Sequence, residues 1–310
     1  MNDRQRFIPG LNLTSNAQGG RSFADSEVSR VICASSLAAD SSLTLSEHFH
    51  QYFTVSLAET PEERFKAYQL RFRVYCEEFG YLDPRNRPDS EYKSRIEVDE
   101  FDDRSLHCVV THRPTGQVAG CARVVTTREN LHEDPLPLEK FCLPALSLGA
   151  METLSQREQV GEISRLAVDP QFRRLMGENG EQYGTVSPVV PAHEQEVKYF
   201  SIIAMAALMG ATASLEMLGL TEMFAMMNPA LPRLISRTGL MFERAGQVTE
   251  YHGKRAPYQM SVEAFQQNLI GPYAELYEQL RCCLGGGVTL QLPNTATARC
   301  GSIAAIAGVK

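Results

Sequence analysis

The sequence predicts an α/β (α+β) domain in which helices flank a mixed, mostly antiparallel sheet. Two patterns predict it: apolar segments of strand length, and helical segments that begin with capping signals. The predicted strands are 53–58, 106–110, 118–125, 162–168, 223–226, 242–251 and 258–261. The predicted helices are 61–79, 197–218 and 229–237.

The boundaries of these elements follow from particular residues. Thr60 is a suitable N-cap and Glu63 completes a capping box, so the first long helix begins at Pro61 and ends at Gly80. The turn 114–116 (Pro-Thr-Gly) between two apolar runs predicts a hairpin. The sequence contains no internal repeat, and the length of the patterned part of the chain is within the size of one domain.

The ends of the chain differ from its middle in composition. Residues 1–44 are rich in Ser, Ala, Asn and Gly, and we expect a disordered leader there. A Gly-Gly-Gly run opens segment 285–310, which we expect to be a flexible tail. The folded domain is therefore predicted to span 45–284. Glycines and prolines in 175–196 predict a loop.

Composition and charge exclude several classes of protein. Hydrophobic residues make up 43% of the 310 residues, yet no apolar run reaches the roughly 18 residues of a membrane-spanning helix. The net charge of −7 argues against a general nucleic-acid binder. The eight cysteines lack C-x-x-C spacing, which argues against a metal site and indicates free thiols in a reducing, cytoplasmic setting.

Charged residues stand inside apolar sequence at four places. These segments are Arg71–Tyr75, Glu97–Asp102, Gly120–Val125 and Glu162–Val168. Burying such charges is costly unless they pair, so we expect their arginines and carboxylates to share one polar cluster. Such a cluster is more often a functional site than a scaffold, although ion-pair networks also serve structure.

Five ordered segments carry a resemblance that covers about residues 47–265. They are Arg71 with Tyr75 and Tyr81, Glu97–Asp102, Gly120–Arg123, Phe141 after Pro-Leu-Glu-Lys, and Glu162–Val168. The sequence resembles the GNAT acyltransferase superfamily, and more narrowly the acyl-homoserine-lactone synthases and long-chain N-acyl amino acid synthases. It is most similar to the acyltransferases associated with PEP-CTERM/exosortase systems.

The resemblance implies a GNAT-type fold and a reaction. A long-chain fatty acyl group would move from acyl carrier protein, or from acyl-CoA, to the amine of an amino acid or similar small acceptor. The acyl-phosphopantetheine thioester would be a co-substrate, with no bound cofactor. The helix after the strand ending at Val168 begins about twenty residues later, so the compact phosphate-binding loop of acetyl-CoA users is altered. This departure suits a donor carried on a protein.

The resemblance also implies roles for individual residues. The acceptor and ion cluster would comprise Arg71, Tyr75, Tyr81, Asp99, Asp102 and Arg123. The donor-binding residues would be Leu166, Val168, Arg173, Arg174 and Phe141. Catalytic roles would fall to Glu162, Ser164 and Arg165. The plainer interpretation is that these are solvated charges on a strand and a loop.

The chemistry requires a base, an oxyanion donor and an acid. We expect Glu162 to act as base through water, and a backbone N–H within 166–168 to bind the oxyanion. Ser164 or Tyr199 could protonate the leaving thiolate. Residues two apart on a strand share a face, so Glu162 and Ser164 are predicted on one face and Arg165 on the other.

Three alternatives stay open. One is an acyl-homoserine-lactone synthase using S-adenosylmethionine, although that group usually has Trp where this chain has Tyr81. Another is a nucleophilic cysteine, but Cys108 and Cys121 have no adjacent base motif. The third is a non-catalytic acyl-carrier-binding module. Acceptor specificity is expected in the 82–96 and 127–160 segments.

Overall fold

The computed structural model describes residues 43–81, 95–127, 134–173 and 202–285. The predictions for the leader before residue 43, the loop 175–196 and the tail after Gly285 therefore lie outside the described residues. So do Arg174 and Tyr199. Among the described residues, no helix is both long enough and apolar enough to cross a membrane.

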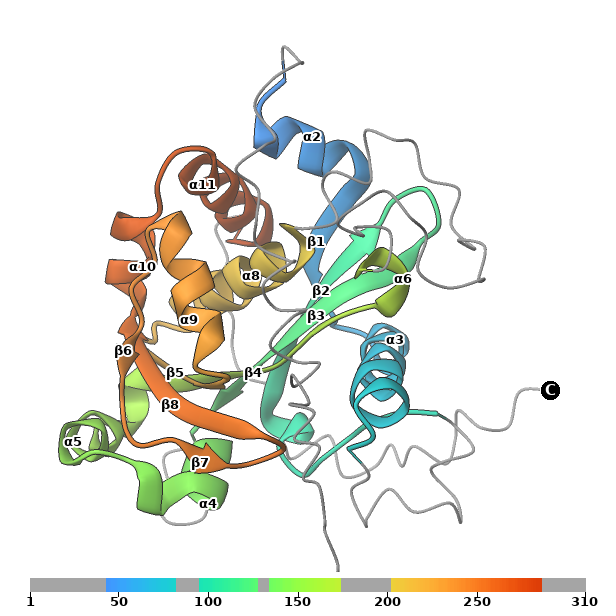
Figure 1. Cartoon of the computed structure of the whole chain (residues 1–310). Coiled ribbons are helices and arrows are strands. Elements are labelled where there is room, and N and C mark those ends of the chain that lie inside the picture. Colours follow the sequence, from blue (N-terminus) through green and yellow to red (C-terminus); the bar gives the residue numbers. More distant parts are fainter. Residues whose placement is uncertain (1–42, 82–94, 128–133, 174–201, 286–310) are drawn as a thin grey trace, which may run out of the picture.

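One mixed sheet forms the centre of the molecule (Figure 1). Its strands are β1 (Phe53–Leu57), β2 (Ser105–His112), β3 (Gln117–Thr126), β4 (Val160–Val168), β5 (Glu222–Met227), β6 (Glu243–Arg244), β7 (Thr249–Glu250) and β8 (Lys254–Ser261). The order is β1-β2-β3-β4-β5-β8-β6, with β7 paired to β8. Every pairing is antiparallel except that of β4 with β5, which confirms the prediction of a mixed, mostly antiparallel sheet. The single strand predicted at 242–251 is wrong, because two short strands occupy its ends.

Helices cover both faces of the sheet. They are α2 (Leu45–Tyr52), α3 (Pro61–Arg71), α4 (Pro137–Cys142), α5 (Leu148–Ser155), α6 (Pro170–Arg173), α8 (Ile203–Met217), α9 (Ala230–Ile235), α10 (Val262–Asn268) and α11 (Pro272–Gly285). Short 3-10 turns lie at 102–104, 143–145, 157–159 and 236–238. A π-helical segment, η1 (Phe72–Glu78), continues α3.

The capping box predicted before α3 is confirmed. The Thr60 hydroxyl accepts the Glu63 N–H at 3.2 Å, and the Glu63 carboxylate accepts the Thr60 N–H at 3.0 Å. The chain stays helical past Arg71 but widens into η1, and Gly80 has a φ of +67°. Wide turns of this kind occur often at functional sites. Here the wide turn begins directly after the first buried arginine.

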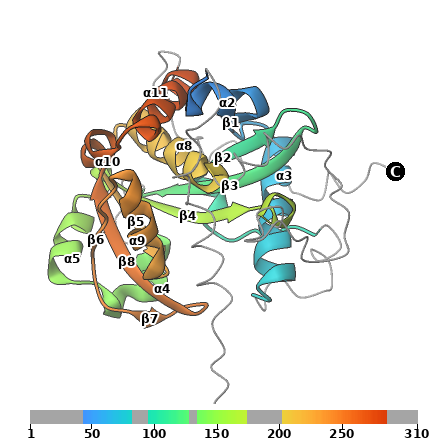
Figure 2. The same ribbon diagram turned by 45° about the horizontal axis from the view of Figure 1, so that its top comes forward.

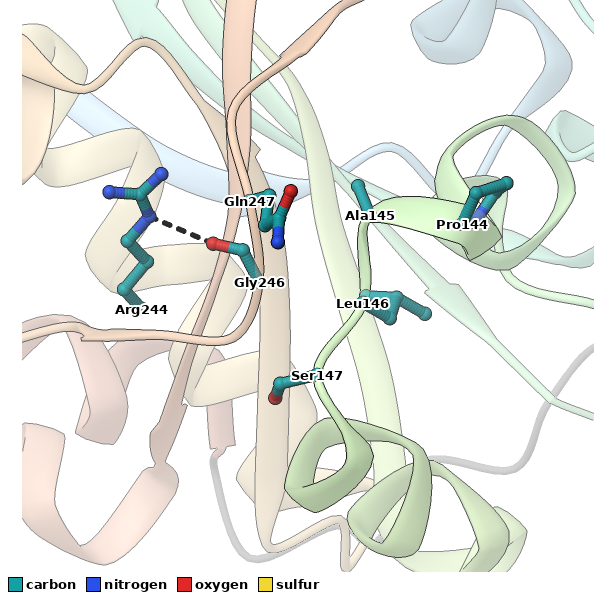
Figure 3. A pocket seen from close by; sticks show the side chains of 7 residues that line it. All are labelled: Pro144, Ala145, Leu146, Ser147, Arg244, Gly246 and Gln247. Carbon is teal, nitrogen blue, oxygen red and sulfur yellow. Dashed lines mark hydrogen bonds between the residues drawn. The ribbon is translucent and has the colours of Figure 1, made fainter.

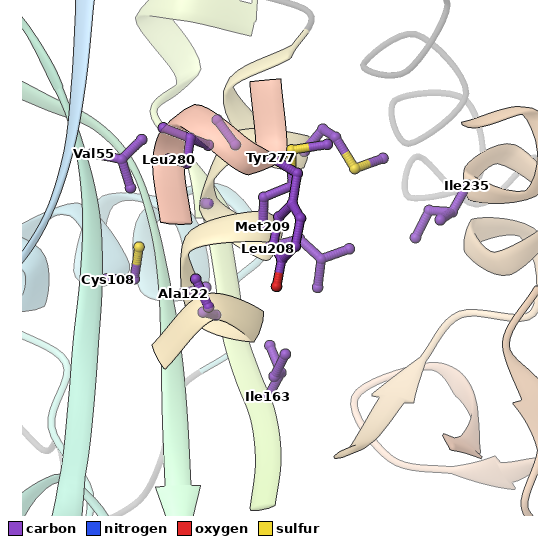
Figure 4. Packing of buried hydrophobic residues seen from close by; sticks show 14 of the residues in the cluster. Val55, Cys108, Ala122, Ile163, Leu208, Met209, Ile235, Tyr277 and Leu280 are labelled. Atoms are coloured by element: carbon purple, nitrogen blue, oxygen red, sulfur yellow. The ribbon is translucent and has the colours of Figure 1, made fainter. Parts of the chain in front are cut away.

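The main core lies between the sheet and α8, which α2 and α11 cover from outside (Figures 1 and 2). Figure 4 shows part of this core, including Cys108 of β2 and Met209 of α8. A Cβ on Gly210 would lie 2.4 Å from the Cys108 sulfur, so glycine is needed for α8 to approach β2. The methionines of α8 at 205 and 209 are part of this core.

Two smaller cores lie on the opposite face of the sheet. One packs α3 and η1 against β2, β3 and β4 through Leu70 and Val74. The other packs α4 and α5 over β4 and β5 through Leu138 and Phe224. Between these two cores the sheet carries the charged segments that the sequence singled out.

Strands β4 and β5 pair along only three residues each. Val160, Gly161 and Glu162 of β4 face residues 222–224 of β5. Beyond Glu162 the two strands diverge, so among the described residues no strand pairs with that edge of β4. Unpaired backbone groups on a strand edge can bind an extended ligand.

Candidate functional site

A β-bulge shapes β4 beside the diverging edge. Arg123 of β3 faces Ser164, and Cys121 faces Ala167, so Ala122 alone stands opposite Arg165 and Leu166. Arg165 has a φ of +53°, which is uncommon for a residue with a side chain. The bulge breaks the alternation of the strand. The prediction that Arg165 would face away from Ser164 is therefore wrong: both side chains reach the same charged cluster.

The predicted polar cluster is present as three arginines and three carboxylates. Its members are Arg71, Arg123, Arg165, Glu97, Asp99 and Asp102. Arg71, at the end of α3, donates to both Asp102 oxygens at 2.6 and 3.0 Å and to Glu97 at 2.5 Å. Only 1% of the Arg71 side chain is exposed, so these pairs are shielded from water.

The other two arginines close the cluster from the sheet. Arg123 donates to Asp99 at 2.5 Å, to Asp102 at 2.8 Å and to the Ser164 hydroxyl at 3.1 Å. Arg165 donates to Glu97 at 3.1 Å and to Asp99 at 2.8 Å. The cluster thus ties segment 97–102 to α3, β3 and the bulge of β4.

The cluster holds its charges in place rather than exchanging protons. Burial raises the pKa of Glu97, but Arg71 and Arg165 outweigh it and lower that pKa to about 2. Burial and the same kind of competition, with Arg71 and Arg123, leave the pKa of Asp102 well below its ordinary value. Both carboxylates stay ionised at neutral pH, so neither is suited to general acid or base catalysis.

Glu162 is a buried carboxyl whose pKa is raised rather than lowered. It lies where β4 leaves β5, and only 2% of it is exposed. Its carboxylate accepts the Leu138 N–H at 2.7 Å. Burial raises the pKa of Glu162 to about 8, although the Leu138 N–H and the charges of Arg123 and Arg165 oppose the rise. A carboxyl that gains and loses a proton near neutral pH is suited to general base catalysis.

The backbone of β4 supplies a hydrogen-bond donor to the open edge. The N–H of Asp169 donates to Ala119 of β3 at 2.8 Å. Since successive residues of a strand direct their N–H groups to opposite sides, the Val168 N–H points toward the diverging edge. The Leu166 carbonyl is already occupied by the Tyr75 hydroxyl at 2.8 Å. The predicted donor residues Leu166 and Val168 therefore line this edge.

Arg173 is engaged by its own chain. Its Nε donates to the Val168 carbonyl at 2.9 Å, and its guanidinium pairs with Glu78 of η1. The arginine therefore joins α6 to η1 below the site. Its predicted contact with a donor phosphate would require this pair to open, and it stays a prediction.

The predicted residues Tyr81 and Phe141 belong to one row of aromatic rings. The ring of Tyr81 stacks on that of Tyr75 with ring centres 6.3 Å apart, and its centre lies 4.7 Å from that of the His252 ring. Tyr251 stacks on Phe141 at 5.5 Å and meets His252 edge-on at 4.9 Å. The Tyr81 hydroxyl donates to the His252 carbonyl at 3.1 Å.

Sequence reasoning missed Tyr251 and His252 of this row. They lie in the turn between β7 and β8, where His252 and Gly253 have φ of +50° and +88°. The only sequence signal was two aromatic side chains directly before a glycine, at and just after the end of the strand predicted at 242–251. The row joins the residues assigned to the acceptor side and to the donor side.

Cysteine and metal chemistry find no support in the described part of the chain. Burial raises the pKa of Cys121 to about 12 and that of Cys108 further still, so both are thiols rather than nucleophilic thiolates. Within residues 43–81, 95–127, 134–173 and 202–285, no three His, Cys, Asp or Glu side chains gather as metal ligands. Six cysteines in these ranges are free.

Two backbone hydrogen bonds join segment 145–147, which follows α4, to segment 245–247, and this joint positions α4. The Ser147 N–H donates to Ala245 at 2.8 Å, and the Gln247 N–H donates to Ala145 at 2.7 Å. A pocket of about 310 Å³ opens along this joint, where Arg244 donates to the Gly246 carbonyl at 2.8 Å (Figure 3). The pocket is separate from the ion cluster. The joint holds α4, and therefore the Leu138 N–H, against the strand that leads to Tyr251.

Comparison with protein families identifies this arrangement. Residues 70–179 match the family model described as acetyltransferase (GNAT) domain. The chain carries a GNAT acyltransferase domain. The matched segment runs from the end of α3 through the bulged strand, and it includes the whole ion cluster and Glu162. A search of curated proteins found no match.

Solved structures that resemble the GNAT acyltransferase chain include enzymes of two kinds. TofI, in a complex with an inhibitor and MTA, is 17% identical, with a TM-score of 0.47 over 73% of this chain and 99% of that chain. FeeM, an N-acyl amino acid synthase from uncultured soil microbes, is 12% identical, with a TM-score of 0.45 over 72% and 97%. BjaI, a CoA-dependent acyl-homoserine lactone synthase with MTA, is 13% identical, with a TM-score of 0.46 over 80% and 98%. Similarity at this level does not decide a substrate.

Proposed function

We propose that this GNAT acyltransferase moves a long-chain fatty acyl group from a phosphopantetheine thioester to the amine of an amino acid or a similar small acceptor. The product is an N-acyl amino acid. The observation that carries the proposal is the position of Glu162: a buried carboxyl, able to take up a proton near neutral pH, at the point where β4 diverges from β5.

The diverging edge supports binding of the donor thioester. A pantetheine arm is extended and carries amides, so it can lie along the unpaired edge of β4 as an added strand would. The Val168 N–H then faces the thioester carbonyl and donates to its oxygen. As the amine attacks, this oxygen becomes an oxyanion, and the same hydrogen bond grows stronger.

Glu162 supports the proton transfer that the acceptor needs. An attacking amine must lose a proton to form an amide, and a carboxylate reached through one water can accept it. Glu97 and Asp102 of the cluster beside it do not compete for that proton, because arginines hold both carboxylates ionised. The cluster instead fixes the bulge, and the bulge sets the direction of the edge that receives the donor.

The donor is proposed to be acyl carrier protein or CoA. The long separation along the sequence between Val168 and α8 supports a carrier protein as the donor. A link to PEP-CTERM/exosortase systems and a cytoplasmic location rest on the sequence alone.

The test is production of new lipids by the intact protein. Cells expressing the chain are extracted and analysed by mass spectrometry beside cells expressing Glu162→Gln. New N-acyl amino acids only with the wild-type protein would support the proposal and would name the acceptor and chain length. Acyl-homoserine lactones would replace it with the autoinducer reaction. Purified enzyme supplied with acyl carrier protein or CoA thioesters of the same chain length then identifies the donor.

A further inference from the structure

The site as described has a base and an oxyanion donor but no proton donor for the leaving sulfur. Of the two groups that the sequence suggested, Tyr199 lies outside the described residues. Ser164 accepts a hydrogen bond at 3.1 Å from Arg123, a member of the ion cluster. The structure offers a third group, Tyr251, which lies in the turn between β7 and β8.

The ring of Tyr251 is held from two sides. Phe141 stacks on it with ring centres 5.5 Å apart and planes 22° apart, and His252 meets it edge-on at 4.9 Å. Phe141 lies one turn after Leu138 on α4, whose N–H binds the Glu162 carboxylate. One short helix therefore holds both the carboxyl and the tyrosine ring.

Charged groups of the site act electrostatically on the Tyr251 hydroxyl. Among the described ranges, no side chain or backbone group forms a hydrogen bond with it. Burial raises the pKa of Tyr251, and the charged groups that act on it are Arg165, Glu162, Cys142 and Asp99, the arginine opposing the rise. Arg165 lies at the bulge of β4, Glu162 is the proposed base, Cys142 ends α4, and Asp99 belongs to the ion cluster. A phenol that stays protonated, with its O–H free, is available as a donor.

We infer that Tyr251 is the proton donor to the leaving thiolate. This inference rests on the proposed acyl transfer. The amine nitrogen forms a bond to the thioester carbon, and its proton passes to the Glu162 carboxylate. The tetrahedral oxyanion then reforms the carbonyl, the C–S bond breaks with its electron pair on sulfur, and the sulfur takes the Tyr251 proton. Glu162 returns its proton to the phenolate through water, so amine and thioester give amide and thiol with nothing else consumed.

The test compares donors whose leaving groups differ in their need for a proton. Tyr251→Phe keeps the ring and its stacking but loses the hydroxyl. Wild type and variant are supplied with one acid as its pantetheine thioester and as its 4-nitrothiophenyl thioester, with a mixture of protein amino acids as acceptor. Release of thiol is followed by absorbance, and amide formation by mass spectrometry. The matched control is Tyr277→Phe, a buried tyrosine of α11 outside the site.

We expect Tyr251→Phe to lower the rate with the pantetheine thioester about 100-fold, and the rate with the nitrothiophenyl thioester by less than about threefold. The acidic nitrothiophenol leaves without a proton, so it bypasses the missing hydroxyl. Equal losses with both donors, or no loss with either, would overturn the inference. Thiol release that depends on Tyr251 without an amino acid amide would instead count against the proposed acceptor alone.

Discussion

The raised pKa of Glu162 makes a prediction about stability as well as activity. The ordinary pKa of a glutamate is near 4.5, and in the folded protein that of Glu162 is about 8. Between these values the folded protein holds a proton that the unfolded chain has lost. The folded state is therefore favoured at low pH, and this advantage declines as the pH rises toward 8.

The size of the effect follows from the shift. One pKa unit corresponds to about 1.4 kcal/mol, so the wild-type protein should lose about 3 kcal/mol between pH 5 and pH 8 from this residue. Glu162→Gln removes the titration, keeps the shape and retains an oxygen for the Leu138 N–H. Relative to wild type, the variant should gain up to about 1.4 kcal/mol per pH unit in this range.

The assay is urea unfolding of both proteins at pH 5, 6, 7 and 8, with the free energies of unfolding subtracted at each pH. Subtraction removes the titration of every other group. A difference between the two proteins that does not change with pH would refute the reasoning, because it would mean that Glu162 is ionised throughout. The same variant should have lost acyl transfer, so it would be more stable at pH 8 and inactive.

Three further expectations concern the same site. The rate of acyl transfer at low acceptor concentration should rise through an apparent pKa near 8 in the wild type, and this limb should be missing from any residual activity of Glu162→Gln. A lysine at position 71 cannot reproduce the paired hydrogen bonds of the arginine to two carboxylates, so Arg71→Lys should lower the free energy of unfolding by about 3 kcal/mol. Lys66 is exposed, and Lys66→Ala should change the free energy of unfolding by less than about 0.5 kcal/mol. Calorimetry of both variants at one pH measures the difference. Gly246→Ala would place a Cβ 2.1 Å from the Ala145 carbonyl, so it should cost about 2 kcal/mol and lower activity by displacing α4; a fully active, equally stable variant would contradict the role of that joint.

Much of the fold was predictable because its signals are local. The capping box at Thr60 and the hairpin between β2 and β3 depend on residues within a few positions of one another. The pairing of Arg71 with Asp102 was also predictable, because buried charges in apolar sequence need partners. Such inferences identify which charged groups form ion pairs, but they do not give the distances and orientations of those pairs.

The parts that sequence could not predict depend on tertiary contacts. The bulge at Arg165 places an arginine in a conformation that its own sequence disfavours, and the ion pairs with Glu97 and Asp99 hold it there. Tyr251 was predicted as the last residue of a strand, but it lies in the turn after β7, where its ring stacks on Phe141. Short helices such as α4 carry too few residues for a periodic pattern.

The balanced ion cluster also limits how this enzyme can diverge. Five of its six charged side chains are at most 8% exposed, and Arg165 is 25% exposed, so exchanging any of the buried five leaves an opposite charge unpaired in the interior. Evolutionary change there must come in compensating pairs. Apart from Tyr251, whose hydroxyl is the proposed proton donor, the aromatic row beside it carries no such constraint, since one ring can replace another at small cost. New acceptor or chain-length preferences should therefore arise by drift along the row from Tyr81 to Phe141, while the charges behind it stay fixed.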